Sequence, residues 1–481
     1  MRLYAYRSRY EIHDYELGDI PRLERDMSVW EKSAFNPKTG HYEPKYYYDE
    51  ESKIIYIPRG YNIKKIEGLV GKSAVFKKDC NPTEKVSYSI LTPPRTDNQK
   101  TGVRYLAGLE DYKWTNEQSQ LVLNLPTGEG KTYCTIAACS LLGLKAMIIV
   151  GTDDLRKQWN EKILEYTNLT QSGVYMINGD KSIEKLYKSS SRTLAGYAFY
   201  ITTHSSLRVY MKNHGASGLN DVFSKLGIGV KVIDEAHLQY ENTFMIDYAV
   251  NVARNFYLTA TFEQSDNATD TMFQKAYYDI YKLTLKTTSR KHVIWIRVEY
   301  SSRANAVEKA YVRGIRGLQK YNYISYQMSK PFLANVFKQI MQLLIERMKL
   351  EGKILVLSPK KESCEYFKDI LAELYPEYKS CVHYTGSKVE TFEPYGVVFA
   401  TVSMLGTGND ISGLRAIINM EPMSSKRNTA QLVGRLRMFA EDKDTYYVEP
   451  IDMSIPQVVR MVSKREQVLD GIVKDKLNVK M

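Results

Sequence analysis

The sequence predicts an α/β protein, because short apolar runs typical of buried parallel strands alternate with helical patterns along most of its 481 residues. Two of these runs lead directly into polar segments. Gln120 to Leu125 precedes a glycine-rich loop, and Ile228 to Ile233 ends at two acidic residues. Parallel sheets bind ligands at the carboxyl ends of their strands. The pattern therefore predicts a parallel sheet with a binding site at that edge.

The glycine-rich loop, Leu125 to Thr132, has the pattern of a phosphate-binding loop. Its glycines permit a tight turn that aims backbone N–H groups at phosphate oxygens, and the next helix presents its positive end to the same anion. A lysine then supplies charge for the β and γ phosphates, and a threonine hydroxyl supplies a ligand for Mg²⁺. The expected nucleotide contacts are Thr127, Gly128, Glu129, Gly130, Lys131 and Thr132.

The acidic string Asp234 to His237 reads Asp-Glu-Ala-His. Asp234 is expected to hold Mg²⁺ partly through water, together with Thr132, and Glu235 is the candidate base that polarises an attacking water. Taken alone, the string is also compatible with solvated acids at a helix N-terminus. The phosphate loop upstream argues against that alternative, so the two motifs together predict one site for ATP and Mg²⁺.

These motifs resemble those of DEAH-type helicases of superfamily 2, and most closely the UvsW-like bacteriophage helicases that remodel branched DNA. The resemblance runs from about Arg95 to Tyr447. It implies two tandem RecA-like motor domains that hydrolyse ATP in the cleft between them. Leu125 stands where the general phosphate loop has a glycine, and this matches the compact Thr-Gly-x-Gly-Lys-Thr form found in helicases.

Three domains are expected from the chain and from this resemblance. Residues 1–90 predict a small α+β accessory domain, residues 91–330 a first motor domain with a basic C-terminal insertion, and residues 331–481 a second motor domain. The accessory module of UvsW-like helicases touches DNA, so Arg59 and Lys64 are candidate phosphate contacts. The alternative is that its clustered tyrosines simply pack against their neighbours.

The first motor domain carries further motifs that the resemblance makes informative. Gln99 is the candidate reader of the adenine edge, because an amide donates and accepts at once; Gln118 lies closer to the loop but in a stretch that resembles a turn. Two strand-to-helix corners resemble segments that hold one nucleic-acid strand by its phosphates, although ordinary corners with helix caps would look alike. Their candidate contacts are Gln158, Trp159, Thr203, His204 and Ser205.

A basic stretch with interspersed aromatic residues, Lys282 to Lys320, follows the first motor motifs. It suits a surface that tracks a DNA backbone, but a solvated face with Trp295 and Tyr300 turned into the core would give the same pattern. Before it, Leu258 to Thr261 resembles the motif that relays between the ATP site and the nucleic acid, with Phe262 where many members have proline.

The second motor domain supplies the remaining candidates. Arg435 is the best candidate for an arginine finger, a cation that stabilises charge developing on the γ-phosphate; Arg437 is the alternative, because the family's second arginine is displaced here. Gly408 would let the loop approach the nucleotide, and Asp410 matches the acid that contacts the ribose. The remaining candidate nucleic-acid contacts of this domain are Lys360 and Thr401.

Composition narrows the class of protein. A net charge of +12 and a pI near 9.1 favour a polyanionic partner. No apolar run reaches the length of a membrane span, which predicts no membrane association. The five cysteines show no metal-ligand spacing, which predicts a reducing compartment. We therefore expect a monomer in the cytoplasm, or in the host cytoplasm for a bacteriophage protein.

The sequence thus predicts an ATP-dependent helicase or translocase that remodels forked, branched or duplex DNA in replication, recombination or repair. Single-stranded DNA or RNA is the further possible partner. Two alternatives stay open: an RNA helicase or transcription-release translocase with the same motor, and a DNA-binding or annealing protein with a degenerate motor. The intact Lys131, Asp234, Glu235 and Arg435 argue against the last of these.

Overall fold

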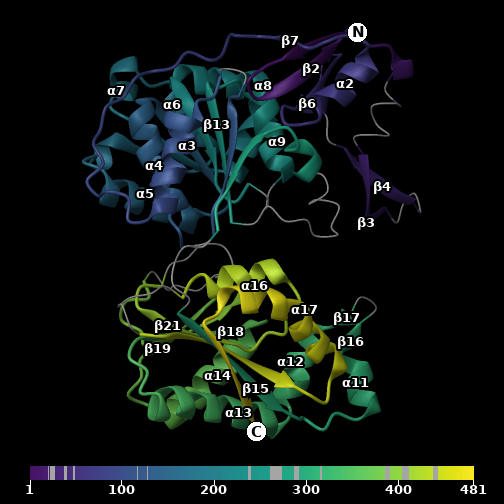
Figure 1. The fold of residues 1–481 in the computed structure, drawn as a ribbon, viewed down its shortest axis with the longest axis vertical. Helices are drawn as coiled ribbons and strands as arrows, with labels where there is room; N and C mark the ends of the chain where they lie inside the picture. Colours follow the sequence, from purple (N-terminus) through teal and green to yellow (C-terminus); the bar gives the residue numbers. More distant parts are fainter. Residues whose placement is uncertain are drawn as a thin grey trace. The chain divides into compact units, whose positions relative to one another are not determined.

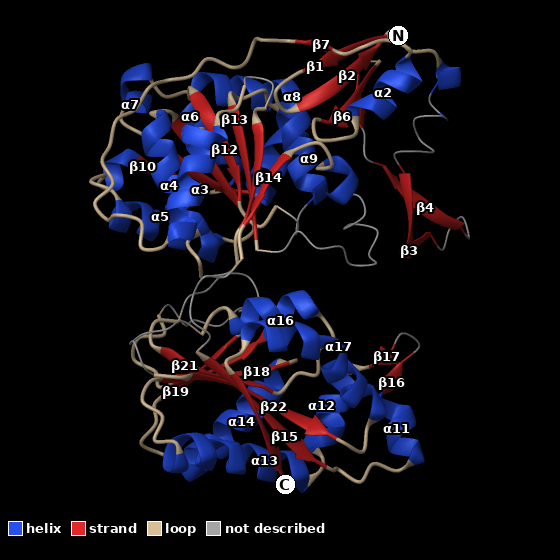
Figure 2. Cartoon of the chain, viewed as in Figure 1, coloured by secondary structure: helices blue, strands red, loops and turns tan. Residues whose placement is uncertain are grey.

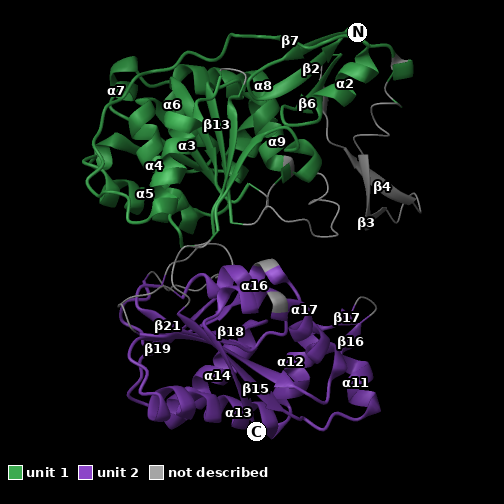
Figure 3. Ribbon diagram, viewed as in Figure 1, with its two compact units in different colours: residues 1–288 green, residues 289–481 purple. Residues whose placement is uncertain are grey.

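A computed structural model (Figure 1) describes residues 1–19, 21, 28–36, 41–46, 49–51, 53–115, 118–126, 128–236, 240–260, 273–286, 292–314, 317–384, 391–402, 411–436 and 443–481. The chain divides into two compact units, Met1–Thr288 and Ser289–Met481 (Figure 3). Within the described ranges, no helix combines the length and the apolar character that crossing a membrane requires.

Unit 1 is built on a seven-stranded parallel sheet in the order β10-β11-β9-β12-β13-β8-β14. Its strands are β8 (Gln120–Asn124), β9 (Lys145–Val150), β10 (Val174–Met176), β11 (Phe199–Thr203), β12 (Ile228–Ile233), β13 (Arg254–Thr259) and β14 (Tyr281–Thr284). Its helices are α3 (Asp97–Ala107), α4 (Lys131–Leu142), α5 (Asp153–Tyr166), α6 (Gly179–Tyr187), α7 (Ser191–Ala195), α8 (His204–Lys225) and α9 (Tyr240–Ala249).

Helices cover both faces of this sheet (Figure 2), and the side chains show why. Along β9, Ile148 belongs to one apolar core, whereas its neighbours Met147 and Ile149 belong to another. Successive strand residues point to opposite faces, so an apolar side chain at every position buries both faces at once. This is the arrangement that the uninterrupted apolar runs predicted, and the expected α/β fold is confirmed.

An accessory sheet, in the order β5-β6-β2-β1-β7, begins the chain. Its elements are β1 (Arg2–Ala5), β2 (Arg9–His13), β5 (Asp49–Glu51), β6 (Ile54–Pro58), α2 (Ile63–Val70) and β7 (Val75–Phe76), and β3 (Ser28–Asn36) pairs separately with β4 (His41–Tyr46). The accessory sheet shares a continuous apolar core with the motor sheet. The Ser119 hydroxyl also donates to the Arg7 carbonyl at 2.6 Å, and the Ser8 hydroxyl to the Val250 carbonyl at 2.6 Å. The accessory segment is therefore part of unit 1, not a separate body.

Unit 2 repeats the parallel architecture with seven strands in the order β19-β20-β18-β21-β22-β15-β23. The strands are β15 (Val293–Tyr300), β18 (Lys353–Ser358), β19 (Ser380–His383), β20 (Val397–Thr401), β21 (Leu414–Asn419), β22 (Thr445–Asp452) and β23 (Asp475–Lys480). The other elements are α11 (Ala306–Val312), β16 (Arg313–Gly314), β17 (Gly317–Leu318), α12 (Lys320–Met328), α13 (Pro331–Gln342) with a π-helical end (Leu343–Arg347), α14 (Lys361–Leu374), α16 (Lys426–Val433) and α17 (Pro456–Ile472).

The boundary between the motor domains differs from the expected position at residue 331. Strand β15 pairs in parallel with β22 along its whole length and with β23 on its other side, so it belongs to the second sheet. The stretch that the sequence suggested as an insertion of the first domain therefore contains the strands β15, β16 and β17 and the helices α11 and α12 of unit 2. Only the backbone pairing, which joins segments far apart in the chain, reveals this assignment.

Candidate nucleotide site and nucleic-acid contacts

The phosphate loop connects the carboxyl end of β8 to the first turn of α4. Gly128 and Gly130 have φ of +87° and +100°, a region that side-chain-bearing residues rarely adopt. A Cβ atom on Gly130 would lie 2.4 Å from Nε2 of Gln99, so a side chain there would displace the Gln99 amide. The loop is fixed to the neighbouring strand β13, because the Leu125 N–H donates to the Thr259 carbonyl at 3.0 Å.

Lys131 lies over this loop with its ammonium group held in place. Its Nζ donates to the Leu125 carbonyl at 3.1 Å and lies 3.9 Å from Oε1 of Glu235, and only a tenth of the side chain is exposed. Thr132 is the next residue of α4 and is partly exposed. Lysine, glutamate and the helix N-terminus thus converge at one edge of the sheet, the edge that the sequence predicted.

The two acids follow β12 directly and hold different positions. One carboxyl oxygen of Asp234 accepts the Glu235 backbone N–H at 3.0 Å, and the other accepts the indole N–H of Trp159 at 2.8 Å. Burial, followed by the neighbouring Glu235 carboxylate, raises the pKa of Asp234 to about 6. Glu235 itself has φ of +49°, an unusual conformation for a residue other than glycine.

These groups fit Mg²⁺ by their chemistry. The Thr132 hydroxyl and the Asp234 carboxylate are oxygen ligands, the type that Mg²⁺ prefers, and they can hold the ion through one or two protein oxygens, substrate phosphates and water. Two neighbouring, partly exposed carboxylates, of which Asp234 has a raised pKa, are also stabilised by a nearby cation.

The amide of Gln99 is engaged with backbone groups around the phosphate loop. Its oxygen accepts the Arg95 N–H at 2.8 Å, and its nitrogen donates to the Glu129 carbonyl at 3.3 Å. Asn98, which the sequence did not single out, donates to the Glu129 carboxylate at 3.3 Å. Both residues of α3 therefore hold the phosphate loop through its residue Glu129. Gln118 accepts the Thr115 N–H at 2.8 Å and stabilises a turn, as its sequence context indicated.

Two of the predicted nucleic-acid contacts are buried rings instead. Trp159 is 2% exposed and donates to Asp234, and His204 is 1% exposed. The His204 ring bonds to the Val150 carbonyl through Nδ1 at 3.1 Å and to the Thr243 hydroxyl through Nε2 at 3.3 Å. Both rings are buried, so neither is accessible to a nucleic acid in this structure.

The other predicted nucleic-acid contacts are polar residues that differ in how far they are buried. The Thr203 side chain is buried and caps α8 by accepting the Ser206 N–H at 3.2 Å, whereas Ser205 is exposed at the start of this helix. Gln158 is partly exposed on α5. In unit 2, Lys360 donates from Nζ to the Ser325 hydroxyl at 2.8 Å. Thr401, also in unit 2, ends β20 and is buried.

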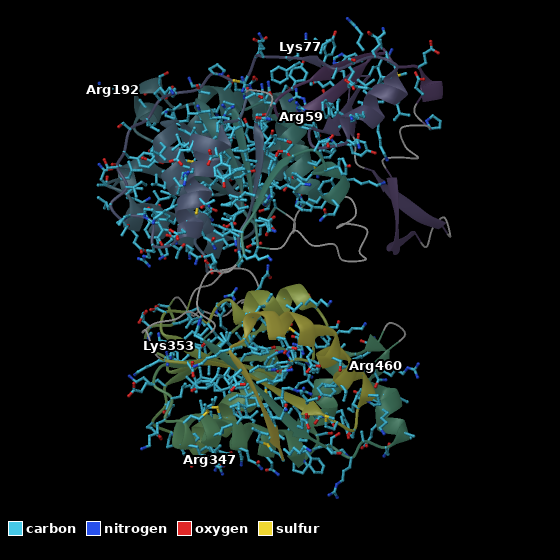
Figure 4. All side chains as sticks on the ribbon, in the orientation of Figure 1. Arg59, Lys77, Arg192, Arg347, Lys353 and Arg460 are labelled. Carbon is cyan, nitrogen blue, oxygen red and sulfur yellow. The ribbon has the colours of Figure 1, made fainter. Side chains whose placement is uncertain are left out.

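Arg59 follows β6 (Figure 4) and lies over the ring of Tyr10, with its guanidinium carbon 4.5 Å from the ring centre. Arg59 and the exposed Lys64 line a cavity of about 520 Å³ between the accessory segment and the motor sheet of unit 1. Two largely exposed tyrosines, Tyr278 and Tyr281, line the same cavity from the motor side.

In the basic stretch Lys282 to Lys320, the structure agrees with the alternative in which Trp295 and Tyr300 turn into the core. Trp295 and Tyr300 of β15 are buried in the core, whereas Tyr311 of α11, in the same stretch, is largely exposed. Arg297 lies 3.3 Å from the Glu466 carboxylate and 3.4 Å from that of Glu299. Arg297 is therefore held by acidic neighbours within the fold.

Arg435 follows α16, whose position is fixed by a buried polar network. Arg465 of α17 donates to the Thr429 hydroxyl at 3.2 Å and to the Glu449 carboxylate at 2.8 Å, and it is 1% exposed. The partly exposed Arg435 therefore lies in the turn that directly follows an anchored helix of unit 2. The remaining predicted residues lie outside the described ones: Thr127, Gly408, Asp410, Arg437, His237, Thr261 and Phe262.

Comparison with known proteins agrees with this architecture. Residues 93–264 match the family described as Type III restriction enzyme, res subunit. The chain is similar to the general transcription and DNA repair factor IIH helicase/translocase subunit XPB of Encephalitozoon cuniculi, with 27% identity over 118 residues. This match covers 24% of the chain and 16% of that protein, so the chain spans only a small part of its relative's length.

The solved structure of Dbp5 shows the same fold at low sequence identity. Dbp5 of S. cerevisiae, bound to RNA and ADP BeF3, is 12% identical, with a TM-score of 0.51 over 80% of this chain and 94% of that one. The T4 UvsW structure is 16% identical, and the match covers 100% of this chain and 99% of that one with a TM-score of 0.37.

Two parallel sheets, one of which carries a glycine-rich loop and an adjacent acidic strand end, give the chain a RecA-like α/β fold. The family match falls on the unit that holds this loop. These matches support a resemblance to superfamily 2 helicases.

Proposed function

We propose that the chain is an ATP-dependent helicase or translocase that remodels forked or branched DNA in replication, recombination or repair. The observation that carries the proposal is the convergence of Lys131, Asp234 and Glu235 at the edge of one sheet, with 3.9 Å between the lysine Nζ and Oε1 of Glu235. A lysine and two acids in this arrangement match the chemistry of phosphoryl transfer from ATP to water.

Each group has a distinct proposed role. Lys131 neutralises the β and γ phosphates, and Glu235 orients the attacking water and accepts its proton. Thr132 and Asp234 hold Mg²⁺, which neutralises charge on the phosphates when it is bound. Arg435 of unit 2 acts as the arginine finger on the same nucleotide, a role worth on the order of 10³ to 10⁵ in rate. Arg437 is the alternative finger.

Further residues are proposed to bind the rest of the nucleotide. Thr127, Gly128, Glu129 and Gly130 contribute loop backbone to the phosphates, and Gln99 reads the adenine after releasing one of its present backbone bonds. From unit 2, Gly408 and Asp410 approach the ribose. Because these residues belong to both units, nucleotide turnover would change how the units engage a bound nucleic acid, which is how hydrolysis becomes movement.

DNA is the proposed track, with single-stranded DNA or RNA as the further candidates. Support comes from the net charge of +12, from the exposed Ser205 at the start of α8 and from the partly exposed Gln158 of α5. Lys360 and Thr401 are the proposed contacts in unit 2. In the accessory segment, Arg59 and Lys64 line a cavity together with exposed tyrosines, a combination suited to phosphate pairing and base stacking.

An RNA track is the second candidate, because Dbp5, whose fold the chain shares, was solved with RNA.

We propose a monomeric protein of the cytoplasm, which is the host cytoplasm for a bacteriophage protein. The five free cysteines are compatible with this reducing compartment.

One experiment tests the proposal and separates its alternatives. ATP-dependent unwinding is measured in parallel on forked DNA, four-way junctions, plain duplex DNA and an RNA–DNA hybrid, with Glu235→Gln as the matched control that keeps the site's shape but lacks the base. The expected result is unwinding of forks and junctions by the wild type alone. Activity confined to the hybrid would favour the RNA alternative, and no ATP-dependent activity on any substrate would leave only a binding protein.

A further inference from the structure

A buried indole makes a direct hydrogen bond to the carboxylate proposed to hold Mg²⁺. Trp159 lies on α5 with 2% of its surface exposed, and its Nε1–H donates to Oδ2 of Asp234 at 2.8 Å. The second carboxyl oxygen, Oδ1, accepts the backbone N–H of Glu235 at 3.0 Å. Both oxygens of Asp234 are therefore held by fixed donors, one from its own turn and one from a different helix.

The two bonds together set the orientation of the carboxylate. The backbone of Asp234 is fixed because its N–H donates to the Ile149 carbonyl at 3.0 Å. With one donor on each oxygen, rotation of the carboxyl group would break at least one hydrogen bond. Each carboxylate oxygen can accept more than one hydrogen bond or ligand, so the donors leave acceptor capacity for water molecules around a metal.

The indole could in principle serve packing alone. Trp159 belongs to the apolar core on one face of the motor sheet, with Ile163 and Leu155 of its own helix. A buried Trp N–H nevertheless needs an acceptor, and here the acceptor is the metal-side acid. Outer hydrogen bonds of this kind orient metal-binding groups, and their removal typically lowers metal affinity or activity by about 10-fold to 100-fold.

We propose that Trp159 is a positioning residue of the nucleotide site: its indole N–H orients Asp234 for Mg²⁺, so that Mg²⁺-dependent nucleotide binding depends on this hydrogen bond. The inference rests on the proposed function, because the role of Asp234 toward Mg²⁺ belongs to that proposal. It also gives Trp159 a role different from the nucleic-acid contact that its sequence motif suggested.

Trp159→Phe is the direct test, because it keeps an aromatic ring in the core and removes the N–H donor. Trp295→Phe is the matched control. Trp295 is also fully buried, it lies in unit 2, and its indole N–H has no acceptor among the residues that the structure describes. The same chemical change is thus made at two buried sites, of which only one has the carboxylate.

The measurement is the affinity of a fluorescent ADP analogue, titrated with Mg²⁺ and, separately, with EDTA present. In the wild type and in Trp295→Phe, Mg²⁺ should tighten nucleotide binding to the same extent. In Trp159→Phe, the Mg²⁺ concentration that gives half of this effect should rise by about 10-fold to 100-fold, with ADP affinity in EDTA unchanged. This readout does not depend on turnover.

The outcomes separate the inference from the proposed function. If the wild type itself shows no effect of Mg²⁺, the proposed metal site fails. If the wild type responds and Trp159→Phe responds at the same Mg²⁺ concentration, the positioning role is refuted and packing alone remains. A weaker affinity in EDTA as well would also contradict it, because it would show a general loss of the loop's structure.

A second measurement uses unmutated protein if Trp159→Phe does not fold. The chain has four tryptophans, so selective ¹⁵N labelling of indoles gives at most four N–H signals. The signal of Trp159, assigned by replacing each of the other three with Phe, should shift when Mg²⁺ is added to the ADP complex. An unchanged Trp159 signal at saturating Mg²⁺ would overturn the inference.

Discussion

The buried ring of His204 allows a quantitative prediction of how stability depends on pH, because burial disfavours the charged form of the ring. Its Nδ1–H donates to the Val150 carbonyl and its Nε2 accepts from the Thr243 hydroxyl. Burial lowers the pKa of His204 from 6.5 to about 4, although the bond to the Val150 carbonyl acts in the opposite direction. The folded protein therefore takes up this proton at a lower pH than the unfolded chain does.

The sign and size of the effect follow by linkage. The contribution of neutral His204 to stability is complete above the unfolded pKa of 6.5 and is lost as the pH falls toward the folded pKa of about 4. Between about pH 7.5 and about pH 5 this amounts to a loss of about 2 kcal/mol in the free energy of unfolding, and about 3 kcal/mol at the acid limit.

The assay is urea unfolding of wild type and His204→Asn across that pH range, followed by tryptophan fluorescence. Asparagine retains an amide donor near the Val150 carbonyl but does not titrate, so the stability difference between the two proteins should shift by about 2 kcal/mol in favour of the variant as the pH falls. His214→Asn, at a half-exposed position of the same helix, is the control. Parallel pH profiles for wild type and His204→Asn would show that His204 does not destabilise the folded protein at low pH.

Two further predictions concern packing in unit 1. Lys231 and Asp247 form a buried ion pair, so Lys231→Met should lower the free energy of unfolding by about 3–5 kcal/mol, and the double variant with Asp247→Leu should recover much of it; equal losses in both would contradict this. A Cβ on Gly60 would lie 2.5 Å from the Ala276 carbonyl oxygen, so Gly60→Ala should lower the melting temperature by loosening the accessory segment. Gly68→Ala, on the same segment with open space around it, should leave the melting temperature unchanged or raise it.

The sequence predicted the motor sheet of unit 1 well because its signal is local. The apolar run Ile228 to Ile233 is β12, and the run from Gln120 is β8. A parallel strand buried on both faces must be apolar at nearly every position, and the loop that follows must carry its own turn residues and charges. Both requirements concern consecutive residues of the chain, so the sequence alone could predict the position of Lys131 at the sheet edge.

The features that the sequence did not predict depend on contacts between distant segments. Strand β15 was assigned to the wrong domain because its partners, β22 and β23, lie more than a hundred residues further on. Its Arg297 suggested a basic surface, yet it is paired with Glu466 of α17. Likewise, the motif around Trp159 indicated a nucleic-acid contact, and only the packing of α5 against the sheet shows that its N–H reaches Asp234.

ATP hydrolysis by wild type and Lys131→Ala, with and without forked DNA, tests the central claim most directly, because Lys131 is the cation placed on the phosphate loop. We expect forked DNA to stimulate the wild type, and Lys131→Ala to lose turnover by on the order of 10²-fold or more while binding the same DNA with unchanged affinity. Hydrolysis that DNA does not affect, or that survives in Lys131→Ala, would contradict this expectation.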